Sequence, residues 1–400
     1  MTSYRNSDPH PAIMQGSPPQ LVPPRMDWDR PPWNRWAFQN IRQILPTAEV
    51  WRGDGPVPAL PRQEQDLDEL PVASTKGAAT TLARLLDDTY TDGFIVLKDG
   101  AVVYERYFNG MTPRTLHLSQ SVAKSVTAAA AGVLVGKGLL DVNTPVTHYI
   151  PELNDTAYRG ALLQHVLDMA SGVTFDETYT DPPSDVGQLD VSSGWKPVPP
   201  GADPSLRWPR HVFEQVLGLG KLECRHGERF SYRSIETEVL GFCMERVTGK
   251  RLHEIVSEEL WQPMGAEQSA SFTVDAVGSA LADGGFNACL RDYARVGLLY
   301  LQNGGGIIPP EWVEATRTGR HDPSAPFSPA LPEGSYRNQW WIEDPRSRAL
   351  YARGVFGQMI YVNWDHGLVA AKLSSWPDFV NTSFSIATQK ALHAIGRHLA

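Results

Sequence analysis

Ser121-Val122-Ala123-Lys124-Ser125-Val126-Thr127-Ala128-Ala129-Ala130-Ala131-Gly132-Val133-Leu134-Val135-Gly136 is the most informative stretch of this chain. It is rich in Ala, Val and Leu, contains no proline, and ends at Gly136 and Gly138. This texture predicts a buried helix with a glycine stop. The helix begins with an S-x-x-K pattern, and residues three apart on a helix share one face. The Ser121 hydroxyl and the Lys124 ammonium are therefore expected to approach each other.

The start of a helix also provides hydrogen-bond donors and a partial positive charge. Exposed N–H groups and the positive end of the helix dipole suit a developing oxyanion. Ser193-Gly194-Trp195-Lys196 matches the same pattern, but it lies among Gly and Pro in a predicted loop and lacks these features. Ser121 is thus the better candidate nucleophile, against the alternative of an ordinary first-turn serine.

A serine nucleophile needs a proton acceptor. Lysine is a poor base at its free pKa of about 10.4. Burial could depress the pKa of Lys124, or the charged lysine could stabilise a tyrosinate that acts instead. Tyr232-Arg233-Ser234 is the best-placed Y-x-[NS] sequence, because it precedes a predicted helix, whereas Tyr336 and Tyr361 begin similar triplets in strand-rich regions.

The flanking regions predict a sheet at both ends of the chain. Residues 94–97 and 101–107 are β-rich runs around Asp99-Gly100, which is typical of a hairpin. Later strand candidates are residues 339–342, 355–364 and 368–373, and a final helix is expected over 384–399. Further helices are expected at 162–169 and 235–247, and 180–204 is expected to be surface loop. The fold class is therefore α+β, an antiparallel sheet flanked by helices with an inserted helical lobe.

The expected organisation has three parts. Residues 1–32 form a proline-rich arm, anchored through Trp33, Trp36 and Phe38. Residues 33–118 and 280–400 form the sheet lobe, residues 119–279 the helical lobe, and the active site lies between the lobes.

Composition excludes several classes of protein. The 400 residues are 42% hydrophobic and 20% charged, with a net charge of −9, which does not favour disorder or a nucleic-acid or membrane partner. Three widely spaced cysteines and scattered histidines favour neither a disulfide framework nor a metal site. No signal peptide or membrane span is visible, so the expected location is cytoplasmic. We expect no metal and no organic cofactor; a homodimer is possible but not readable from the residues.

Longer strings carry a resemblance to a known family. Ser121-x-x-Lys124, then Tyr232-x-Ser234, then a glycine-bearing strand near the C-terminus resemble class C β-lactamase-like serine hydrolases. Four further stretches are similar to the 6-aminohexanoate-dimer hydrolases, the nylon-oligomer amidases of that family: residues 32–38, 145–153, 339–341 and 372–378. The resemblance covers nearly the whole chain after residue 32.

The resemblance implies roles for particular residues. Ser121 would be the nucleophile, Lys124 its proton partner and Tyr232 the general acid/base, and the N–H groups of Ser121 and Val355 would form the oxyanion hole. The implied substrate-binding positions are Tyr179, Asp190, Ser234, Asp283, Phe356 and Gly357. Tyr179 would lie over the scissile amide, and Asp190 or Asp283 would hold a substrate ammonium group.

Two departures from the family pattern bear on specificity. The Lys-Thr-Gly motif of β-lactamases falls on Ala352-Arg353-Gly354, where Arg353 could replace the missing charge or point to solvent. Phe356 stands where the family usually has histidine. The expected activity is hydrolysis of linear amides and carboxyl esters through an acyl-enzyme, with an esterase of little amidase activity as runner-up. β-Lactam hydrolysis, a cell-wall peptidase and a non-catalytic ligand receptor are further alternatives.

Overall fold

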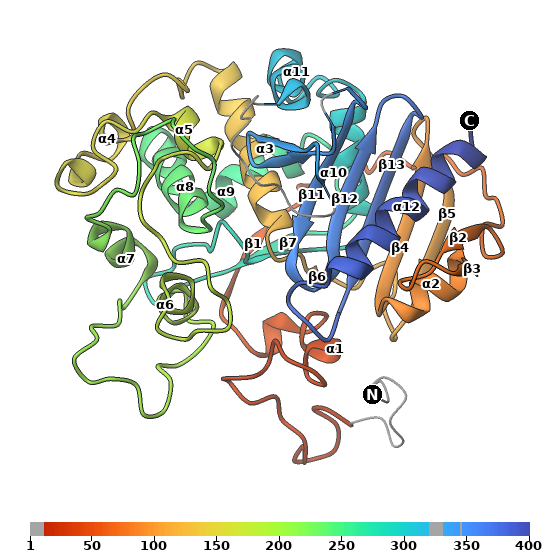
Figure 1. Cartoon of the computed structure of the whole chain (residues 1–400), viewed down its shortest axis with the longest axis horizontal. Coiled ribbons are helices and arrows are strands. Elements are labelled where there is room, and N and C mark those ends of the chain that lie inside the picture. Colours follow the sequence, from red (N-terminus) through yellow and green to blue (C-terminus); the bar gives the residue numbers. More distant parts are fainter. Residues whose placement is uncertain (1–11, 320–330, 345) are drawn as a thin grey trace.

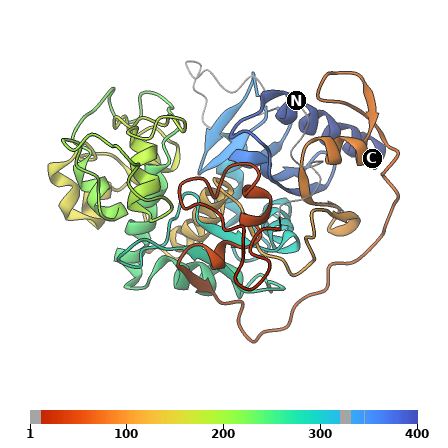
Figure 2. The same ribbon diagram turned by 90° about the horizontal axis from the view of Figure 1, so that it is seen from below.

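The computed structural model describes residues 12–319, 331–344 and 346–400. A large sheet and its covering helices lie on one side, and a group of helices lies on the other (Figure 1). The view from below separates the two regions clearly (Figure 2). Residues 1–11 of the expected N-terminal arm lie outside the described ranges.

The large sheet is antiparallel throughout and has the order β5-β4-β13-β12-β11-β10-β9. Its strands are β4 (Thr91–Lys98), β5 (Ala101–Tyr107), β9 (Ser335–Arg337), β10 (Trp340–Ile342), β11 (Ala349–Gly354), β12 (Gln358–Asn363) and β13 (Leu368–Ser374). The predicted hairpin is confirmed as β4–β5, and its turn residues Asp99 and Gly100 both have positive φ. Residues from the two ends of the chain thus meet where β13 pairs with β4.

Helices cover both faces of this sheet. α10 (Leu290–Leu301) packs against β12 and β13, while α12 (Thr382–His398) and α2 (Leu82–Asp88) lie over the other face. Gly297 allows the close approach of α10, because a Cβ there would lie 2.7 Å from Val369 Cγ1. The predicted C-terminal helix is confirmed, with bounds shifted by one or two residues.

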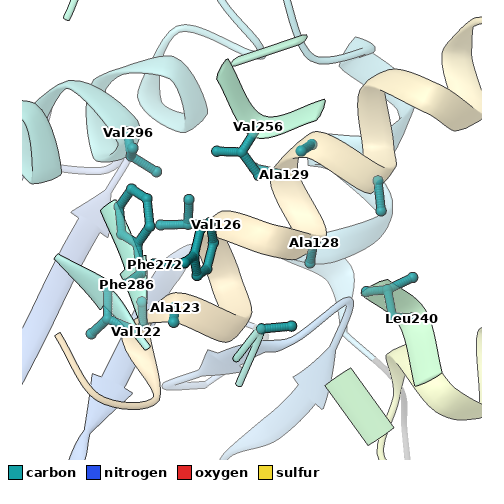
Figure 3. Packing of buried hydrophobic residues seen from close by; sticks show 14 of the residues in the cluster. Val122, Ala123, Val126, Ala128, Ala129, Leu240, Val256, Phe272, Phe286 and Val296 are labelled. Atoms are coloured by element: carbon teal, nitrogen blue, oxygen red, sulfur yellow. The ribbon is translucent and has the colours of Figure 1, made fainter. Parts of the chain in front are cut away.

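The central helix α3 (Val122–Gly136) lies in the main core, as its composition predicts. Val122, Ala123 and Val126 face Phe272 and Phe286, and the next turn packs beside Val256 and Leu240 (Figure 3). Small side chains on α3 let neighbouring elements come close, so the start of the helix is held rigidly.

The helical region holds α4 (Val146–Tyr149), α5 (Leu163–Leu167), α6 (Asp185–Ser192), α7 (Val212–Gly218), α8 (Ile235–Thr248) and α9 (Leu252–Val256). The prediction of loop throughout 180–204 is wrong, because α6 forms there. Ser184 caps α6 by accepting a hydrogen bond from the Gly187 N–H at 3.1 Å, and Val186 and Leu189 are buried. The surrounding Pro and Gly residues are typical of loops, so the sequence does not reveal this short amphipathic helix.

A strand over all of 355–364 is also wrong. Residues Val355–Gly357 form a helical turn, η5, because Phe356 and Gly357 have φ of 60° and 88° and cannot continue a strand. For β11, only the resemblance implies a strand, at residues 352–354. β9 is not among the predicted strands. Neither is a second sheet of order β1-β7-β8-β6, formed by β1 (Thr47–Val50), β6 (His117–Leu118), β7 (Ala270–Thr273) and β8 (Phe286–Ala288).

The arm is anchored from residue 12 onward. Trp28 is fully buried and its indole N–H donates to the Trp195 carbonyl at 2.9 Å, and Phe38 is also fully buried. The remaining short elements are α1 (Asn34–Ala37), α11 (Pro310–Thr318), β2 (Pro71–Ala73), β3 (Ala79–Thr81), η2 (Ile41–Gln43), η3 (Pro151–Asp155) and η4 (Ser257–Trp261).

Candidate active site

Ser121 and Lys124 meet at the first turn of α3. Ser121 is the N-cap residue, and the Lys124 ammonium donates to its Oγ at 2.9 Å. Lys124 is only 1% exposed, whereas Ser121 is half-buried and lines a cavity. The geometry expected from the S-x-x-K spacing is therefore present.

Lys124 has a complete set of acceptors. Besides Ser121, its ammonium donates to Ser234 Oγ at 3.1 Å and to the carbonyl and carboxylate oxygens of Asp283 at 3.0 and 3.2 Å. Burial by itself lowers the pKa of Lys124, but the charge of Asp283, followed by Tyr232 and Glu177, raises it above its ordinary value. These charges favour the protonated lysine, which supports the alternative of a charged Lys124 beside Tyr232 over that of a depressed lysine pKa.

Tyr232 precedes α8 and lies beside this lysine. Its ring stacks on Trp341, with centroids 5.5 Å apart, and the Lys124 Nζ lies 5.2 Å from the Tyr232 ring centroid. Burial raises the pKa of Tyr232, whereas Lys124 and a hydrogen bond with Ser121 oppose the rise. Burial thus disfavours the ionised tyrosine, and the charge of Lys124 lowers the cost of ionising it.

Glu177 is a site residue that the sequence did not reveal. Its carboxylate accepts hydrogen bonds from the Ser234 N–H at 2.9 Å, from Ser234 Oγ at 2.5 Å and from the Tyr179 hydroxyl at 2.8 Å. Burial raises its pKa, against the charge of Lys124. Glu177 thus orients Ser234 and Tyr179 together. No motif surrounds it, so only its contacts identify it.

The end of β11 reaches the start of α3 through Gly354. A Cβ at this position would lie 2.5 Å from the Ser119 carbonyl oxygen, so only glycine permits the approach. Val355, the next residue, lines the same cavity as Ser121. Within the described part of the chain, the backbone hydrogen bonds include none donated by the N–H of Ser121 or of Val355. Both groups are available for an oxyanion.

Phe356 and Gly357 complete this turn. Phe356 is 1% exposed, packs edge-on against Phe38 and tilts toward Phe379, with centroid distances of 5.2 and 4.7 Å. A Cβ at Gly357 would lie 2.2 Å from Trp376. Gly357 lines the larger cavity, and Phe356 forms a wall of the smaller one.

The two acidic residues expected in the cleft have different surroundings. Asp283 is the counter-ion of Lys124 through Oδ2, and its backbone N–H donates to Glu238 at 2.8 Å, whereas its Oδ1 has no hydrogen-bond partner among the described residues. Asp283 also lines the smaller cavity, and its role in holding a substrate ammonium stays a prediction. Asp190 is half-buried and pairs with Lys196 at 3.0 Å; Lys196 also pairs with Asp29 at 2.9 Å. This cluster of Asp29, Asp190 and Lys196 carries one net negative charge when all three are ionised.

The pKa of Asp190 is shifted by its surroundings. Burial raises its pKa to about 6, with Lys196 opposing the rise and Asp29 adding to it. Its charge is therefore sensitive to the pH range just below neutrality.

Two cavities meet at Ser121. The larger, of about 270 Å³, is lined by Tyr179, Tyr232, Trp341, Arg353 and residues of α12 among others. The smaller, of about 50 Å³, is lined by the acidic residues Asp29, Asp190 and Asp283, with Tyr179, Ser234 and Phe356. Tyr179 stacks on Phe379, with centroids 5.7 Å apart, where the two cavities adjoin.

The comparison with known families covers the segment that carries Ser121, Lys124 and Tyr232. The β-lactamase family model matches residues 78–394. The chain belongs to the β-lactamase family. As such it is a serine hydrolase with the β-lactamase-like fold.

Three named proteins are similar to this chain over different shares of its length. The 6-aminohexanoate-dimer hydrolase of Paenarthrobacter ureafaciens is 36% identical over 94% of this chain and 93% of its own length. A solved structure described as a "putative 6-aminohexanoate-dimer hydrolase" from Bacillus anthracis has a TM-score of 0.85 and 31% identity, covering 94% of this chain and 97% of that one. Esterase EstB of Burkholderia gladioli is 28% identical over 43% of this chain and 44% of its own length.

Metal-binding clusters and membrane-spanning helices are both absent from the described residues. Among them, no group of three or more His, Cys, Asp or Glu side chains is placed to hold a metal ion. No helix in the described ranges is long and apolar enough to cross a membrane.

Proposed function

We propose that this β-lactamase-family hydrolase cleaves linear amides of the aminohexanoate-oligomer type, and carboxyl esters, through an acyl-enzyme on Ser121. The observation that carries the proposal is the 2.9 Å contact between the Lys124 ammonium and Ser121 Oγ, where two cavities meet. The Paenarthrobacter relative, matched over nearly its whole length, supports the amide class. The similarity to esterase EstB supports ester cleavage.

Ser121, Lys124 and Tyr232 have separate roles in the proton transfers of the first half-reaction. Tyr232 in its ionised form, stabilised by the Lys124 cation, accepts the Ser121 proton as the Ser121 oxygen attacks the carbonyl carbon. The tetrahedral oxyanion receives hydrogen bonds from the Ser121 and Val355 N–H groups. Tyr232 then donates the proton to the leaving nitrogen or oxygen as its bond to carbon breaks.

Deacylation repeats these steps with water. Tyr232 accepts a proton from water as the water oxygen attacks the acyl carbon. The bond from the acyl carbon to Ser121 Oγ then breaks as Tyr232 donates that proton to the serine oxygen. Neither half-reaction consumes an external oxidant or reductant.

The smaller cavity suits a cationic substrate end. Asp29 and Asp190 share one lysine, which leaves a net negative charge near the nucleophile. We infer that Asp190 holds the ammonium group of the acyl half.

An esterase with little amidase activity is the second candidate, since the same residues expel an alcohol more easily than an amine. A cytoplasmic location and a homodimer stay predictions.

Intact-protein mass spectrometry tests the covalent step. The enzyme is mixed with a p-nitrophenyl ester and, separately, with 6-aminohexanoate dimer. We expect a transient acyl adduct on Ser121 and no adduct or turnover in Ser121→Ala. Ser205→Ala, in an exposed loop, is the matched control. Turnover that survives in Ser121→Ala would exclude the mechanism, and the relative rates with the two substrates decide between amidase and esterase.

A further inference from the structure

The turn between β11 and β12 carries Val355, whose N–H is proposed to bind the oxyanion. This turn has an uncommon conformation, because Phe356 and Gly357 have φ of 60° and 88°. A phenylalanine with positive φ is strained and persists only where neighbouring contacts hold it. The position of the Val355 N–H therefore depends on the contacts that hold the turn.

Gln358, the first residue of β12, binds the turn through its side chain. It is 2% exposed, and its Nε2 donates to the Ser374 carbonyl at 2.7 Å. The same nitrogen lies 3.3 and 3.4 Å from the carbonyl oxygens of Phe356 and Val355. An amide nitrogen has two hydrogens, so one serves Ser374 and the two turn carbonyls share the other. The side-chain amide thus connects the turn to β13.

The acceptor end of this amide is also engaged. Gln358 Oε1 accepts a hydrogen bond from the Ser374 N–H at 3.0 Å. The backbone pairing of β12 with β13 ends at Met359 and Lys372, so the Gln358 side chain takes the place of a strand partner for the buried backbone of Ser374. This contact needs a donor and an acceptor side by side, which an amide provides and a carboxylate or a thioether does not.

Val355 is therefore held on both sides along the chain. On its N-terminal side, Gly354 packs against the backbone that leads into α3. On its C-terminal side, Gln358 binds the Val355 carbonyl, and the Phe356 N–H donates to the Phe379 carbonyl at 2.8 Å. These contacts restrict rotation of the peptide groups next to Val355, and with it the position of the Val355 N–H.

We propose that Gln358 is a positioning residue for the reaction, whose side-chain amide holds the turn so that the Val355 N–H is placed for the oxyanion of the tetrahedral intermediate. The amide is occupied by backbone groups, so it acts through the turn and not on the substrate. A hydrogen-bond donor stabilises developing charge best when it is already in place. Loosening the turn should therefore weaken binding of the transition state and leave binding of the ground state intact. This inference rests on the proposed function and adds a residue that supports its oxyanion hole.

The first test compares Gln358→Met with Gln215→Met. Gln215 is also buried and also donates to a backbone carbonyl, but it lies on α7 and lines neither cavity. With p-nitrophenyl acetate, kcat/KM of Gln358→Met should fall at least about 10-fold, part of the loss of about 100-fold or more that removal of a whole oxyanion donor causes. Gln215→Met should keep the wild-type value. Equal kcat/KM in the two variants would overturn the proposal.

A pair of inhibitors separates positioning from general damage to the cavity. An alkyl trifluoromethyl ketone adds the Ser121 oxygen to its carbonyl carbon and forms a tetrahedral oxyanion, whereas the corresponding methyl ketone binds mainly without this addition. Gln358→Met should weaken binding of the trifluoromethyl ketone by about the factor lost in kcat/KM and leave the methyl ketone unchanged. Equal weakening of both ketones would indicate a distorted cavity and would overturn the positioning role.

A second variant covers the case in which Gln358→Met does not fold. Gln358→Asn keeps the amide but withdraws it by one methylene group, and it should show the same selective loss for the trifluoromethyl ketone. Loss of folding in both variants, under conditions where Gln215→Met folds, would assign Gln358 to the stability of the sheet alone and overturn the proposal.

Failure of the proposed function has a separate outcome. If the wild type cleaves neither the ester nor 6-aminohexanoate dimer, the proposed function is wrong. The ketone pair needs no turnover, so it still tests Gln358 through the adduct on Ser121. If the wild type forms no adduct with the trifluoromethyl ketone, the oxyanion hole is refuted, and the role of Gln358 with it.

Discussion

Gly354 packs directly against the carbonyl group of Ser119, two residues before the nucleophile. The contact joins the end of β11 to the start of α3, and a Cβ on Gly354 would lie 2.5 Å from the Ser119 oxygen. Backbone atoms cannot give way as a flexible side chain can. The spacing between the Ser121 and Val355 N–H groups therefore depends on the absence of one methyl group.

Gly354→Ala should damage catalysis more than substrate binding. Moving the Val355 N–H away from the oxyanion position removes one donor, a loss that typically costs about 100-fold to 1,000-fold in kcat. The measurement is kcat and KM for a p-nitrophenyl ester. Gly218→Ala is the control, because a Cβ there meets no atom within 4 Å. If the Gly354→Ala enzyme kept the kcat of the control, Val355 would not contact the oxyanion.

The ionisation of Asp190 should make KM depend on pH for cationic substrates and not for neutral ones. Its pKa is raised to about 6, so its charge is lost as the pH falls through that value and gained as the pH rises. KM for an amino-terminated amide should therefore decrease as the pH rises from about 5 to 7. A neutral ester should show no such step in KM.

Asp190→Asn removes the titrating group and serves as the paired experiment. It should raise KM for amino-terminated amides at about pH 7 by about 10-fold and flatten the pH profile, with the neutral ester unaffected. A step near the pKa of Asp190 that persists in this variant, or that appears equally with the ester, would assign the titration to another group.

Most of the catalytic residues could be predicted from the sequence, but the residues that surround them could not. Ser121, Lys124 and Tyr232 are marked by spacing, by helix texture and by a family resemblance, and the hairpin around Asp99-Gly100 follows from turn chemistry. Glu177 carries no such mark, because its role depends on contacts with Ser234 and Tyr179 that the loop conformation creates. A local pattern cannot show such contacts.

Long-range packing explains the other differences. The second sheet pairs β1 with β7, far along the chain, and each of these strands has only 4 residues. Such strands are stabilised by their partners rather than by their own composition. The turn at Val355–Gly357 is likewise hidden from the sequence, since a phenylalanine with φ of 60° is tolerated only where the surrounding packing holds it.

Asp283 should control the protonation of Lys124. Its charge is the largest of the influences that raise the pKa of Lys124 against burial, so Asp283→Asn should lower that pKa. The variant lysine then loses its proton at a lower pH, and with it the charge that supports ionised Tyr232. We expect the alkaline fall in kcat for a neutral alkyl ester to begin at a lower pH in Asp283→Asn than in the wild type. Asp203→Asn, an exposed loop carboxylate, is the control. An unchanged alkaline limb would contradict the role of Asp283 as counter-ion.

Phe356 should act on stability through the packing of the active-site turn. Its ring is 1% exposed and lies between Phe38 and Phe379, so Phe356→Ala leaves a cavity that rigid neighbours cannot close. The free energy of unfolding should fall by about 3–5 kcal/mol, measured by urea denaturation. Val277→Ala, at a position 51% exposed, should change it by less than about 0.5 kcal/mol. If both variants lost the same small amount, the aromatic contacts of Phe356 would contribute nothing to the stability of the fold.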